Sequence, residues 1–410
     1  MIKYLKNNPK QVERKTVLLR LDINEPLSEQ GKLLDDFRVR SAIPTIEFLH
    51  QQKCRVVVVA HLGRPGGKKN LKFSLRPVAE RLATLLDAKF VESESAIPQY
   101  PVRHLIFFTG DIEKERSRFQ LRNVSYKDII VLENIRFYKG EEENTPKFSK
   151  VLSEIADVFV NDAFGCSHRK ESSVVGVTKY LPSFAGLLMQ KEIAALDYLD
   201  KKASSPFVVM MAGMKISEKA KTLENLAKKA DSILLGGGLA NLFLLAKGFE
   251  IGVSAAEKEN VRLASSILKN CKDKIVLPSD VVIANKNLDK ESIRVVDIYK
   301  VGKRDFIVDI GPRTILQYAK ALKLAKTIVW NGPLGHFEVK PFDTGTMALA
   351  KVVGGVSKGR CFGVVGGGET VDAVRLAGQS EYMDHLSTGG GAMLAYLAGS
   401  ELVGLKALDK

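Results

Sequence analysis

The segment CFGVVGGGETVDAVRLAG, residues 361–378, joins an apolar run to a helical pattern through three consecutive glycines. Residues 362–365 predict a buried strand, and the spacing of Val371, Val374 and Leu376 predicts a helix. Glycines let the backbone approach a ligand closely, and a helix N-terminus points free N–H groups at it. The segment therefore predicts a strand, a glycine turn and a helix that together hold an anion, most simply a phosphate.

The same pattern occurs twice more. Residues 233–238 (ILLGGG) lead into an apolar helical segment, and residues 387–391 (STGGG) precede another. One glycine triplet is more often a plain turn than a binding site, but three triplets that each open a helix favour phosphate binding. The chain contains neither G-x-x-x-x-G-K-[ST] nor G-x-G-x-x-G, which argues against a P-loop and against the usual dinucleotide fingerprint.

Composition indicates an ordinary globular chain. At 410 residues, with 45% hydrophobic and 27% charged residues, it is long enough for two or three domains with substantial cores. The first ten residues are too polar for a signal peptide, and no apolar run reaches membrane-spanning length. The four cysteines are far apart and form no C-x-x-C pair. We therefore expect a cytoplasmic protein with reduced thiols, no membrane association and no cysteine metal site.

The net charge of +15 raises the possibility of nucleic-acid binding. The basic residues, however, are spread evenly along the chain rather than gathered in a dense tract, and aromatic residues make up only 7%. Nucleic-acid footprints are usually clustered. We expect a solvated basic surface that favours small anionic substrates, and no nucleic acid as a partner.

Apolar strands alternate with helices in both halves of the chain, which predicts an α/β protein with two Rossmann-like domains, each a parallel sheet flanked by helices. The expected domains are residues 1–183 and 201–390, joined by a long helix over 184–200. Residues 274–284 are expected to be one strand. The run Glu141-Glu-Glu143 is interpreted as a solvated loop.

Charged side chains follow several strands of the first half. In a parallel sheet the carboxyl ends of the strands meet at one edge, where ligands bind. A single arginine after a strand is more often a surface charge, but several at one edge form a pocket for a small polyanion, because guanidinium groups match carboxylate and phosphate oxygens. Arg38 is expected in a nearby loop. The residues at the four strand ends are Asp22, Asn24, His61, Arg64, Arg136 and Arg169.

The second half ends its strands in glycine, asparagine, acids and lysines, which suit a metal-bound nucleotide. An anion pocket and a phosphate-binding domain together suggest phosphoryl transfer between a small acid and a nucleotide. Arg38, Lys215 and the backbone N–H groups of the Gly366 and Gly389 loops are candidates to share the charge of the moving phosphoryl group. The domains would close about the connecting helix to exclude water.

Motifs along nearly the whole chain resemble those of the phosphoglycerate kinase family. In the first half they are RLDINEP (20–26), DFR (36–38), HLGRP (61–65), ENIRF (133–137) and NDAFG (161–165) with His168-Arg169. In the second half they are GMKISEK (213–219), GGG (236–238), LPSD (277–280), DIGP (309–312), WNGP (330–333) and STGGG (387–391). So many matches in the same order make the resemblance specific.

The resemblance implies a monomer that catalyses Mg²⁺-dependent transfer between 1,3-bisphosphoglycerate and ADP, giving 3-phosphoglycerate and ATP, with no organic cofactor. It implies that residues 391–410 pack back on the first domain. By the same resemblance, the glycerate is bound by Asp22, Ile23, Asn24, Arg38, His61, Leu62, Gly63, Arg64, Arg136 and Arg169. The nucleotide is bound by Lys215, Lys219, Gly237, Gly311, Asn331, Glu338, Gly367, Gly368, Glu369 and Thr370, with Glu369 beside the metal.

Three positions depart from the family pattern. Glu369 stands where the family has Asp, Met214 replaces a small residue beside Lys215, and His336 replaces a small aliphatic residue. The extra methylene of Glu369 predicts an active enzyme with altered metal or nucleotide affinity. Two alternatives remain: a weakly active or non-catalytic binding relative, against which Arg38, Lys215 and Lys219 argue, and a dehydrogenase, against which the missing dinucleotide motif argues.

Overall fold

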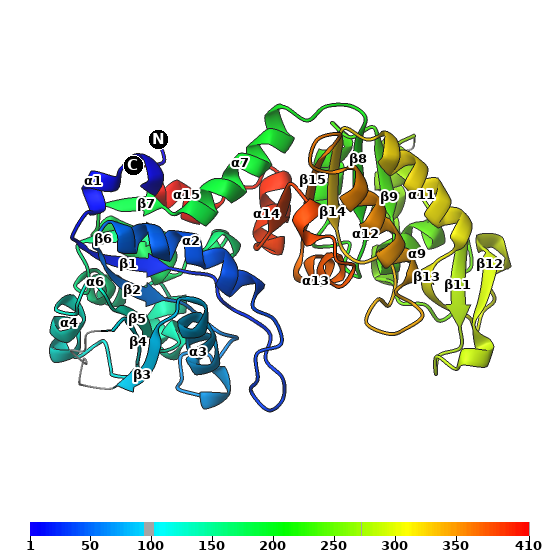
Figure 1. Ribbon diagram of the computed structural model, residues 1–410. Helices are drawn as coiled ribbons and strands as arrows, with labels where there is room; N and C mark the ends of the chain where they lie inside the picture. The colour runs from blue at the N-terminus through cyan, green and yellow to red at the C-terminus, as the bar shows by residue number, and fades with distance from the viewer. Residues whose placement is uncertain (94–101, 272, 410) are drawn as a thin grey trace. The chain divides into compact units, whose positions relative to one another are not determined.

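The computed structural model describes residues 1–93, 102–271 and 273–409, and it divides the chain into two compact units. Unit 1 comprises Met1–Ala194 together with Glu401–Lys410, and unit 2 comprises Ala195–Ser400. The last residue, 410, lies outside the described residues. Helix α7 (Leu187–Lys201) runs from unit 1 into unit 2 (Figure 1).

Unit 1 is built on a seven-stranded sheet of order β3-β4-β5-β2-β1-β6-β7, in which every neighbouring pair is parallel. Its strands are β1 (Thr16–Arg20), β2 (Arg55–Val59), β3 (Lys89–Ser93), β4 (His104–Phe108), β5 (Ile129–Leu132), β6 (Val158–Asn161) and β7 (Ser183–Ala185). Its helices are α1 (Pro9–Val12), α2 (Phe37–Gln51), α3 (Arg76–Leu85), α4 (Glu115–Arg122), α5 (Lys139–Glu142), α6 (Pro146–Ser153) and α15 (Val403–Leu408).

The central strands of unit 1 form the core because both of their faces are covered. All residues of β1 and β5 are buried, as are residues 56–59 of β2. Each fully buried valine or leucine contributes about 1.5–3 kcal/mol to folding. The continuous apolar runs therefore place β1, β2 and β5 at the centre of a parallel sheet, as the sequence predicts.

Unit 2 contains a six-stranded parallel sheet of order β10-β9-β8-β14-β15-β16. Its strands are β8 (Phe207–Met211), β9 (Ser232–Leu235), β10 (Ile275–Val276), β14 (Thr327–Asn331), β15 (Phe362–Gly366) and β16 (His385–Ser387). Its helices are α8 (Ala220–Ala227), α9 (Gly237–Ala246), α10 (Val261–Asn270), α11 (Pro312–Leu324), α12 (Thr344–Val356), α13 (Gly368–Leu376) and α14 (Gly390–Leu397).

A separate three-stranded antiparallel sheet of order β12-β11-β13 also belongs to unit 2 (Figure 1). It is formed by β11 (Asp280–Ala284), β12 (Arg294–Asp297) and β13 (Phe306–Ile310). The single strand expected over residues 274–284 is therefore wrong. Pro278 lies between β10 and β11, and the chain passes there from the parallel sheet into the antiparallel one.

Two boundaries differ from the sequence prediction: the start of the helix that joins the domains, and the start of the C-terminal segment that packs on unit 1. The helix predicted from residue 184 begins at Leu187, because Ser183–Ala185 forms β7 and pairs with β6. Residues 391–400 belong to unit 2 rather than to the segment on unit 1. The Thr222 hydroxyl of α8 donates a hydrogen bond to the Leu394 carbonyl of α14 at 2.9 Å, and this contact explains the assignment.

Helix α15, in contrast, packs within unit 1. The Gly404 amide donates to the Ser167 carbonyl at 2.8 Å, and the amino group of Met1 pairs with Asp409. Figure 1 shows the blue N-terminus and red α15 close together. Among the described residues, no helix combines the length and apolarity needed to span a membrane.

Candidate active site

The loops that follow β5, β2, β1 and β6 form the candidate site of unit 1. These four strands are consecutive in the sheet, and all are parallel, so their carboxyl ends meet at one edge. The predicted anion-binding residues in these loops are thereby brought to the same edge. Arg38 is an exception to the loop prediction, since it lies in the first turn of α2.

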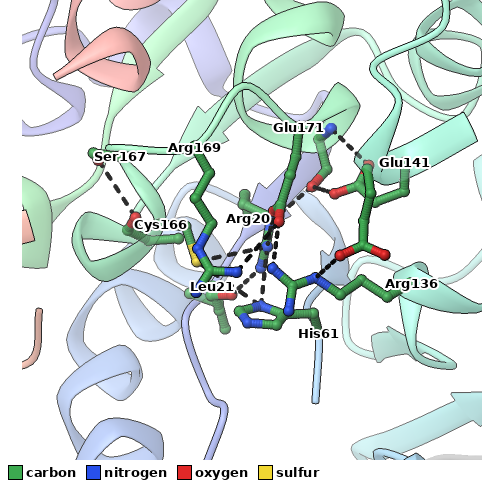
Figure 2. A network of polar contacts seen from close by, with 12 residues as sticks. Arg20, Leu21, His61, Arg136, Glu141, Cys166, Ser167, Arg169 and Glu171 are labelled. Carbon is green, nitrogen blue, oxygen red and sulfur yellow. Dashed lines mark hydrogen bonds and ion pairs between the residues drawn. The ribbon is translucent and has the colours of Figure 1, made fainter. Parts of the chain in front are cut away.

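Arg20, the last residue of β1, lies at the centre of this edge with no exposed surface. Its Nε donates to the Ser173 hydroxyl at 2.8 Å. One NH2 group lies 3.1 Å from His61 Nδ1 and 3.4 Å from Glu171 Oε2 (Figure 2). Burial opposes the charge of Arg20, but the negative charges that Cys166, Glu171, Glu141 and Asp22 carry at the high pH where arginine titrates outweigh it and raise the pKa of the guanidinium. Arg20 therefore remains a buried cation.

Glu171 connects the arginines of three different segments. Its carboxylate accepts a hydrogen bond from Arg136 NH2 and lies 3.6 Å from Arg169 NH1, in addition to its contact with Arg20 (Figure 2). Burial alone would raise the pKa of Glu171, but the three guanidinium groups lower it below its usual value. The carboxylate stays ionised and holds two of the predicted binding residues, Arg136 and Arg169, beside one another.

Glu141 is a buried member of the same network, which corrects the interpretation of residues 141–143 as a solvated loop. It lies in α5 with no exposed surface, and it accepts hydrogen bonds from the Ser173 amide at 2.9 Å and hydroxyl at 2.5 Å. Burial raises the pKa of Glu141 to about 7, although Arg20 opposes the shift. Of the three glutamates 141–143, Glu142 and Glu143 are exposed.

His61 follows β2 and faces Arg20. Burial, followed by the charges of Arg20, Arg136 and Arg169, holds the pKa of His61 well below its usual value, so the imidazole is neutral. Because Arg20 can only donate, Nδ1 of His61 accepts and the ring proton resides on Nε2. A neutral imidazole with an available Nε2–H is suited to donate to an anionic ligand.

The side chains of Asp22, His61 and Cys166 place possible metal-ligand atoms within 4.8 Å of one another. Arg20 NH2 lies 3.1 Å from His61 Nδ1 and 3.7 Å from Cys166 Sγ, so a guanidinium already faces these two atoms. Burial raises the pKa of the Cys166 thiol to about 12 and keeps it protonated. His61 Nδ1 and Cys166 Sγ therefore act as partners of Arg20, and the surrounding positive charge disfavours a cation there.

The loop after β1 is tied to both neighbouring elements. Asn24 Oδ1 accepts a hydrogen bond from the Gly63 amide at 2.9 Å, and the Asn24 carbonyl accepts one from Arg38 NH1 at 2.8 Å. The Gly63 carbonyl in turn accepts from Arg136 NH1 at 2.8 Å. Asn24, Gly63, Arg38 and Arg136 thus form one connected set.

The remaining predicted residues of unit 1 differ in how far their side chains are exposed. Ile23 and Leu62 have buried side chains, so only their backbone groups are available to a ligand. Arg64 is exposed within the loop after β2. Arg20, Glu171 and Ser173 were not predicted as site residues. Arg20 carries one signal, a charged residue that ends an apolar strand, whereas Glu171 and Ser173 carry none because their role depends on distant partners.

In unit 2 the three glycine triplets stand where strands end and helices begin, as predicted. β9 leads to α9, β15 leads to α13, and β16 leads to α14. Gly367 has φ +102, and a Cβ built there would lie 3.0 Å from Asn331 Nδ2. Glu369 is exposed in the first turn of α13, and Thr370 Oγ1 accepts from the Gly332 amide at 2.7 Å.

Lys219 links these strand ends. Its Nζ donates to the Ala212 carbonyl at 2.5 Å and to Asn331 Oδ1 at 2.7 Å, while Asn331 Nδ2 donates to the Gly366 carbonyl at 2.8 Å. Burial lowers the pKa of Lys219 to about 8, and Glu369 opposes that shift. Lys215 differs, since 63% of its side chain is exposed and it pairs with Glu218 at 3.3 Å.

A cavity of about 320 Å³ lies beside this corner, a size that suits a small organic ligand. It is mainly apolar, and Phe306 meets His336 edge to face at 5.3 Å between ring centroids. Of the predicted nucleotide residues, Gly237, Glu338 and Glu369 line it, as do the departures Met214 and His336. Lys215, Lys219, Gly311, Asn331, Gly367, Gly368 and Thr370 are not among its lining residues.

Comparison with known proteins gives a consistent result. The family model described as phosphoglycerate kinase matches residues 8–400. The phosphoglycerate kinase of Chloroflexus aggregans is 42% identical over 399 residues, covering 96% of each chain. That of Borrelia garinii subsp. bavariensis is 43% identical over 404 residues, covering 97% of this chain and 96% of the relative.

Solved structures agree with the sequence relatives. The structure of phosphoglycerate kinase from Coxiella burnetii superposes with a TM-score of 0.81 at 35% identity, covering 100% of this chain and 99% of the other. The crystal structure of the Pyrococcus horikoshii enzyme gives a TM-score of 0.84 at 31% identity, covering 100% and 98%. With the match extending over almost the whole length and both units, this chain belongs to the phosphoglycerate kinase family.

Proposed function

We propose that the protein transfers a phosphoryl group reversibly between 1,3-bisphosphoglycerate and ADP, giving 3-phosphoglycerate and ATP in glycolysis and gluconeogenesis. The observation that carries this proposal is the set of guanidinium groups at the carboxyl edge of the unit 1 sheet, held together by Glu171. A buried carboxylate that keeps several arginines close together prepares a site for a ligand with several negative charges.

In unit 1 we assign glycerate binding to the predicted residues. Arg38, Arg136 and Arg169 supply guanidinium donors, neutral His61 supplies Nε2–H, and exposed Arg64 supplies a further guanidinium group. Asp22 and Asn24 bind polar groups of the substrate, while Ile23, Leu62 and Gly63 contribute through the backbone. The neutral state of His61 supports this assignment, because an additional buried positive charge would be unfavourable beside Arg20.

In unit 2 we assign nucleotide binding to Lys215, Lys219, Gly237, Gly311, Asn331, Glu338, Gly367, Gly368, Glu369 and Thr370. The helix N-terminus of α13 and the glycine turn before it offer N–H groups to phosphates. The apolar cavity with Phe306 and His336 offers a surface for the base.

Mg²⁺ is part of the proposal. The exposed Glu369 carboxylate at the start of α13 fits this ion, which prefers oxygen ligands and is commonly bound by one or two carboxylates together with substrate phosphates. When bound, the ion would neutralise charge on the nucleotide phosphates. The extra methylene of Glu369 should alter metal or nucleotide affinity, and Glu369→Asp tests this prediction: unchanged Mg²⁺ and ATP titrations would contradict it.

For the transfer itself, we assign charge stabilisation to Arg38, Lys215 and the backbone N–H groups near Gly366 and Gly389. Phosphoryl transfer of this kind depends on positioning and charge neutralisation, so the scheme contains no covalent enzyme intermediate. Exposed Lys215 is free to change rotamer toward a substrate. Closure of the two units, a monomeric state and a cytoplasmic location complete the proposal. The four free cysteines support a reducing compartment.

The test is ADP formation from Mg²⁺-ATP and 3-phosphoglycerate, with the acyl phosphate removed by a coupled reaction. We expect turnover that requires the glycerate and falls at least 100-fold in Arg38→Ala and Lys215→Ala, the usual size of a lost transition-state contact. Arg40→Ala and Lys228→Ala serve as controls for the loss of a positive charge, because both residues are exposed and neither is among the predicted site residues. No turnover, with both ligands still bound, would instead identify a non-catalytic relative.

A further inference from the structure

Glu25 is a buried carboxylate close to the proposed anion site. It follows β1 by five residues, and only 3% of its surface is exposed. A buried acid costs free energy in general, and beside a site for polyanions it also repels the ligand. A group with both costs calls for a specific reason to be there.

One oxygen of Glu25 caps the helix that carries Arg38. Oε1 accepts the backbone N–H of Arg38 at 2.6 Å and that of Val39 at 3.2 Å, two amides in the first turn of α2. Such amides have no partner within the helix, and a negative charge at this end is favourable. The cap fixes where α2 begins and therefore where Arg38 stands.

The other oxygen faces the Arg38 side chain. Oε2 lies 3.6 Å from Arg38 NH1, and it has no hydrogen-bond donor among residues 1–93, 102–271 and 273–409. A cap alone needs only Oε1. The second oxygen therefore acts on the Arg38 guanidinium, which also donates to the Asn24 carbonyl at 2.8 Å.

We propose that Glu25 is a positioning residue, which holds the Arg38 backbone through one carboxylate oxygen and orients the Arg38 guanidinium through the charge of the other. The inference rests on the proposed role of Arg38 in phosphoryl transfer. Glu25 touches no reacting atom in this scheme. Its contribution is to reduce the conformational freedom of Arg38 before the substrate arrives.

The charge state of Glu25 adds a second, independent readout. Burial raises the pKa of Glu25 to about 7, and the charged groups that act on it are Arg38 from α2, which opposes the shift, and Asp35 from the segment before α2, which adds to it. The carboxyl is therefore largely protonated at pH 6 and largely ionised at pH 8. Its hold on the guanidinium should strengthen over the same interval.

The experiment compares kcat and KM of the full-length wild type, Glu25→Gln, Arg38→Ala and the double variant. Gln keeps an oxygen for the two amides but removes the charge near Arg38. We expect kcat of Glu25→Gln to fall about tenfold, which corresponds to about 1.4 kcal/mol, with a smaller change in KM for 3-phosphoglycerate because Arg38 is one of several groups that bind it. In the Arg38→Ala background, Glu25→Gln should cause no further loss. Glu29→Gln, an exposed acid on the same loop, should match the wild type.

The pH arm measures the ratio of wild-type kcat to Glu25→Gln kcat, in which substrate ionisation cancels. We expect this ratio to grow from pH 6 to pH 8, and a constant ratio would overturn the role of the charge. Should Glu25→Gln fail to fold, Glu25→Asp keeps the charge but withdraws it from Arg38, and the same fall in kcat is expected.

The outcomes separate this inference from the proposed function. If Arg38→Ala retains full activity, the proposed role of Arg38 fails. If Arg38→Ala is inactive while Glu25→Gln is unimpaired, the positioning role alone fails. An equal loss from Glu25→Gln in both backgrounds would show a purely structural effect and would also overturn the inference.

Discussion

At the scale of single residues, the ionisable groups beneath the candidate site are coupled by burial. Arg20 and Glu141 have no exposed surface, and Glu171 lies between three arginines. Each buried charge would be costly alone, and removing one partner of such a set leaves another uncompensated. The set therefore fixes the positions of Arg136 and Arg169 and does more for orientation than for net stability.

Glu141 makes the stability of the protein depend on pH. Its folded-state pKa is raised to about 7, so between the ordinary value of 4.5 and 7 the folded state binds more protons than the unfolded state. The stabilisation from this group is fully present below the unfolded pKa and is lost as pH rises through 7. We expect the free energy of unfolding of wild type to decrease more between pH 5 and pH 8 than that of Glu141→Gln, measured by urea denaturation.

Glu143→Gln is the matched control for this measurement, since Glu143 lies two residues away and is exposed. It should retain the wild-type difference between the two pH values. The same difference in Glu141→Gln as in wild type would show that Glu141 does not titrate with folding.

Single-residue predictions succeeded where strand ends decide position. Asp22, Asn24, His61, Arg136 and Arg169 were predicted at one sheet edge, and the strand order brings their loops to that edge. Their binding roles stay predictions. The prediction that Glu141 is solvated was wrong, because Glu141 is buried against a distant segment and accepts a hydrogen bond from Ser173, 32 residues away.

At the scale of elements, the turn between β15 and α13 requires a glycine for two reasons: its backbone conformation and its closeness to the Asn331 side chain. Gly367 has φ +102, which side-chain-bearing residues rarely adopt, and a Cβ would meet Asn331 Nδ2 at 3.0 Å. Asn331, the last residue of β14, also accepts a hydrogen bond from Lys219, which donates another to the Ala212 carbonyl just after β8. A movement at this turn would therefore displace the ends of both strands.

We expect Gly367→Ala to raise the Kd for ADP at least tenfold and to lower the thermal midpoint, because the turn must distort to accommodate the methyl group. Isothermal titration and thermal unfolding measure the two effects. Gly355→Ala is the control: Gly355 lies within α12, a Cβ there has nothing within 4 Å, and the change should stabilise the helix by about 0.5–1 kcal/mol. Unaltered ADP binding by Gly367→Ala would argue against the turn as a phosphate site.

Elements were predicted well where the pattern is local and less well where a tertiary contact sets a boundary. The glycine-to-helix transitions at α9, α13 and α14 follow from the sequence. Arg38 was expected in a loop, yet α2 already begins at Phe37, because Glu25 supplies the cap from another part of the chain. β7 replaces the start of a predicted helix because Ser183–Ala185 pairs with β6.

At the scale of the whole molecule, the chain passes from unit 1 to unit 2 and returns. Unit 1 needs both ends of the sequence, since α15 contacts the loop after β6 through the Gly404 amide and the Ser167 carbonyl. A Cβ on Gly404 would lie 2.9 Å from Ser167 Cα, so the helix approaches this loop closely. The loop continues to Arg169 and Glu171 of the candidate site.

We therefore expect deletion of the chain from Glu401 onward to destabilise unit 1 selectively. Thermal unfolding should show a lowered transition for unit 1, and 3-phosphoglycerate binding should weaken. ADP binding should stay at the wild-type level, because unit 2 ends at Ser400 and keeps α14. Equal losses in both ligands would indicate that the deletion damages the whole protein rather than unit 1.

The local order of residues was sufficient to predict an α/β chain, two parallel sheets, their glycine-helix corners and the family. These features depend on hydrophobic periodicity and on strand ends, which are properties of short segments. The antiparallel sheet, the cap of α2 and the buried ion network depend on contacts such as Arg20 with Glu171, 151 residues apart. Which of many charged side chains loses its water and which partner compensates it follows from three-dimensional packing, because desolvation and ion pairing arise only when distant segments meet.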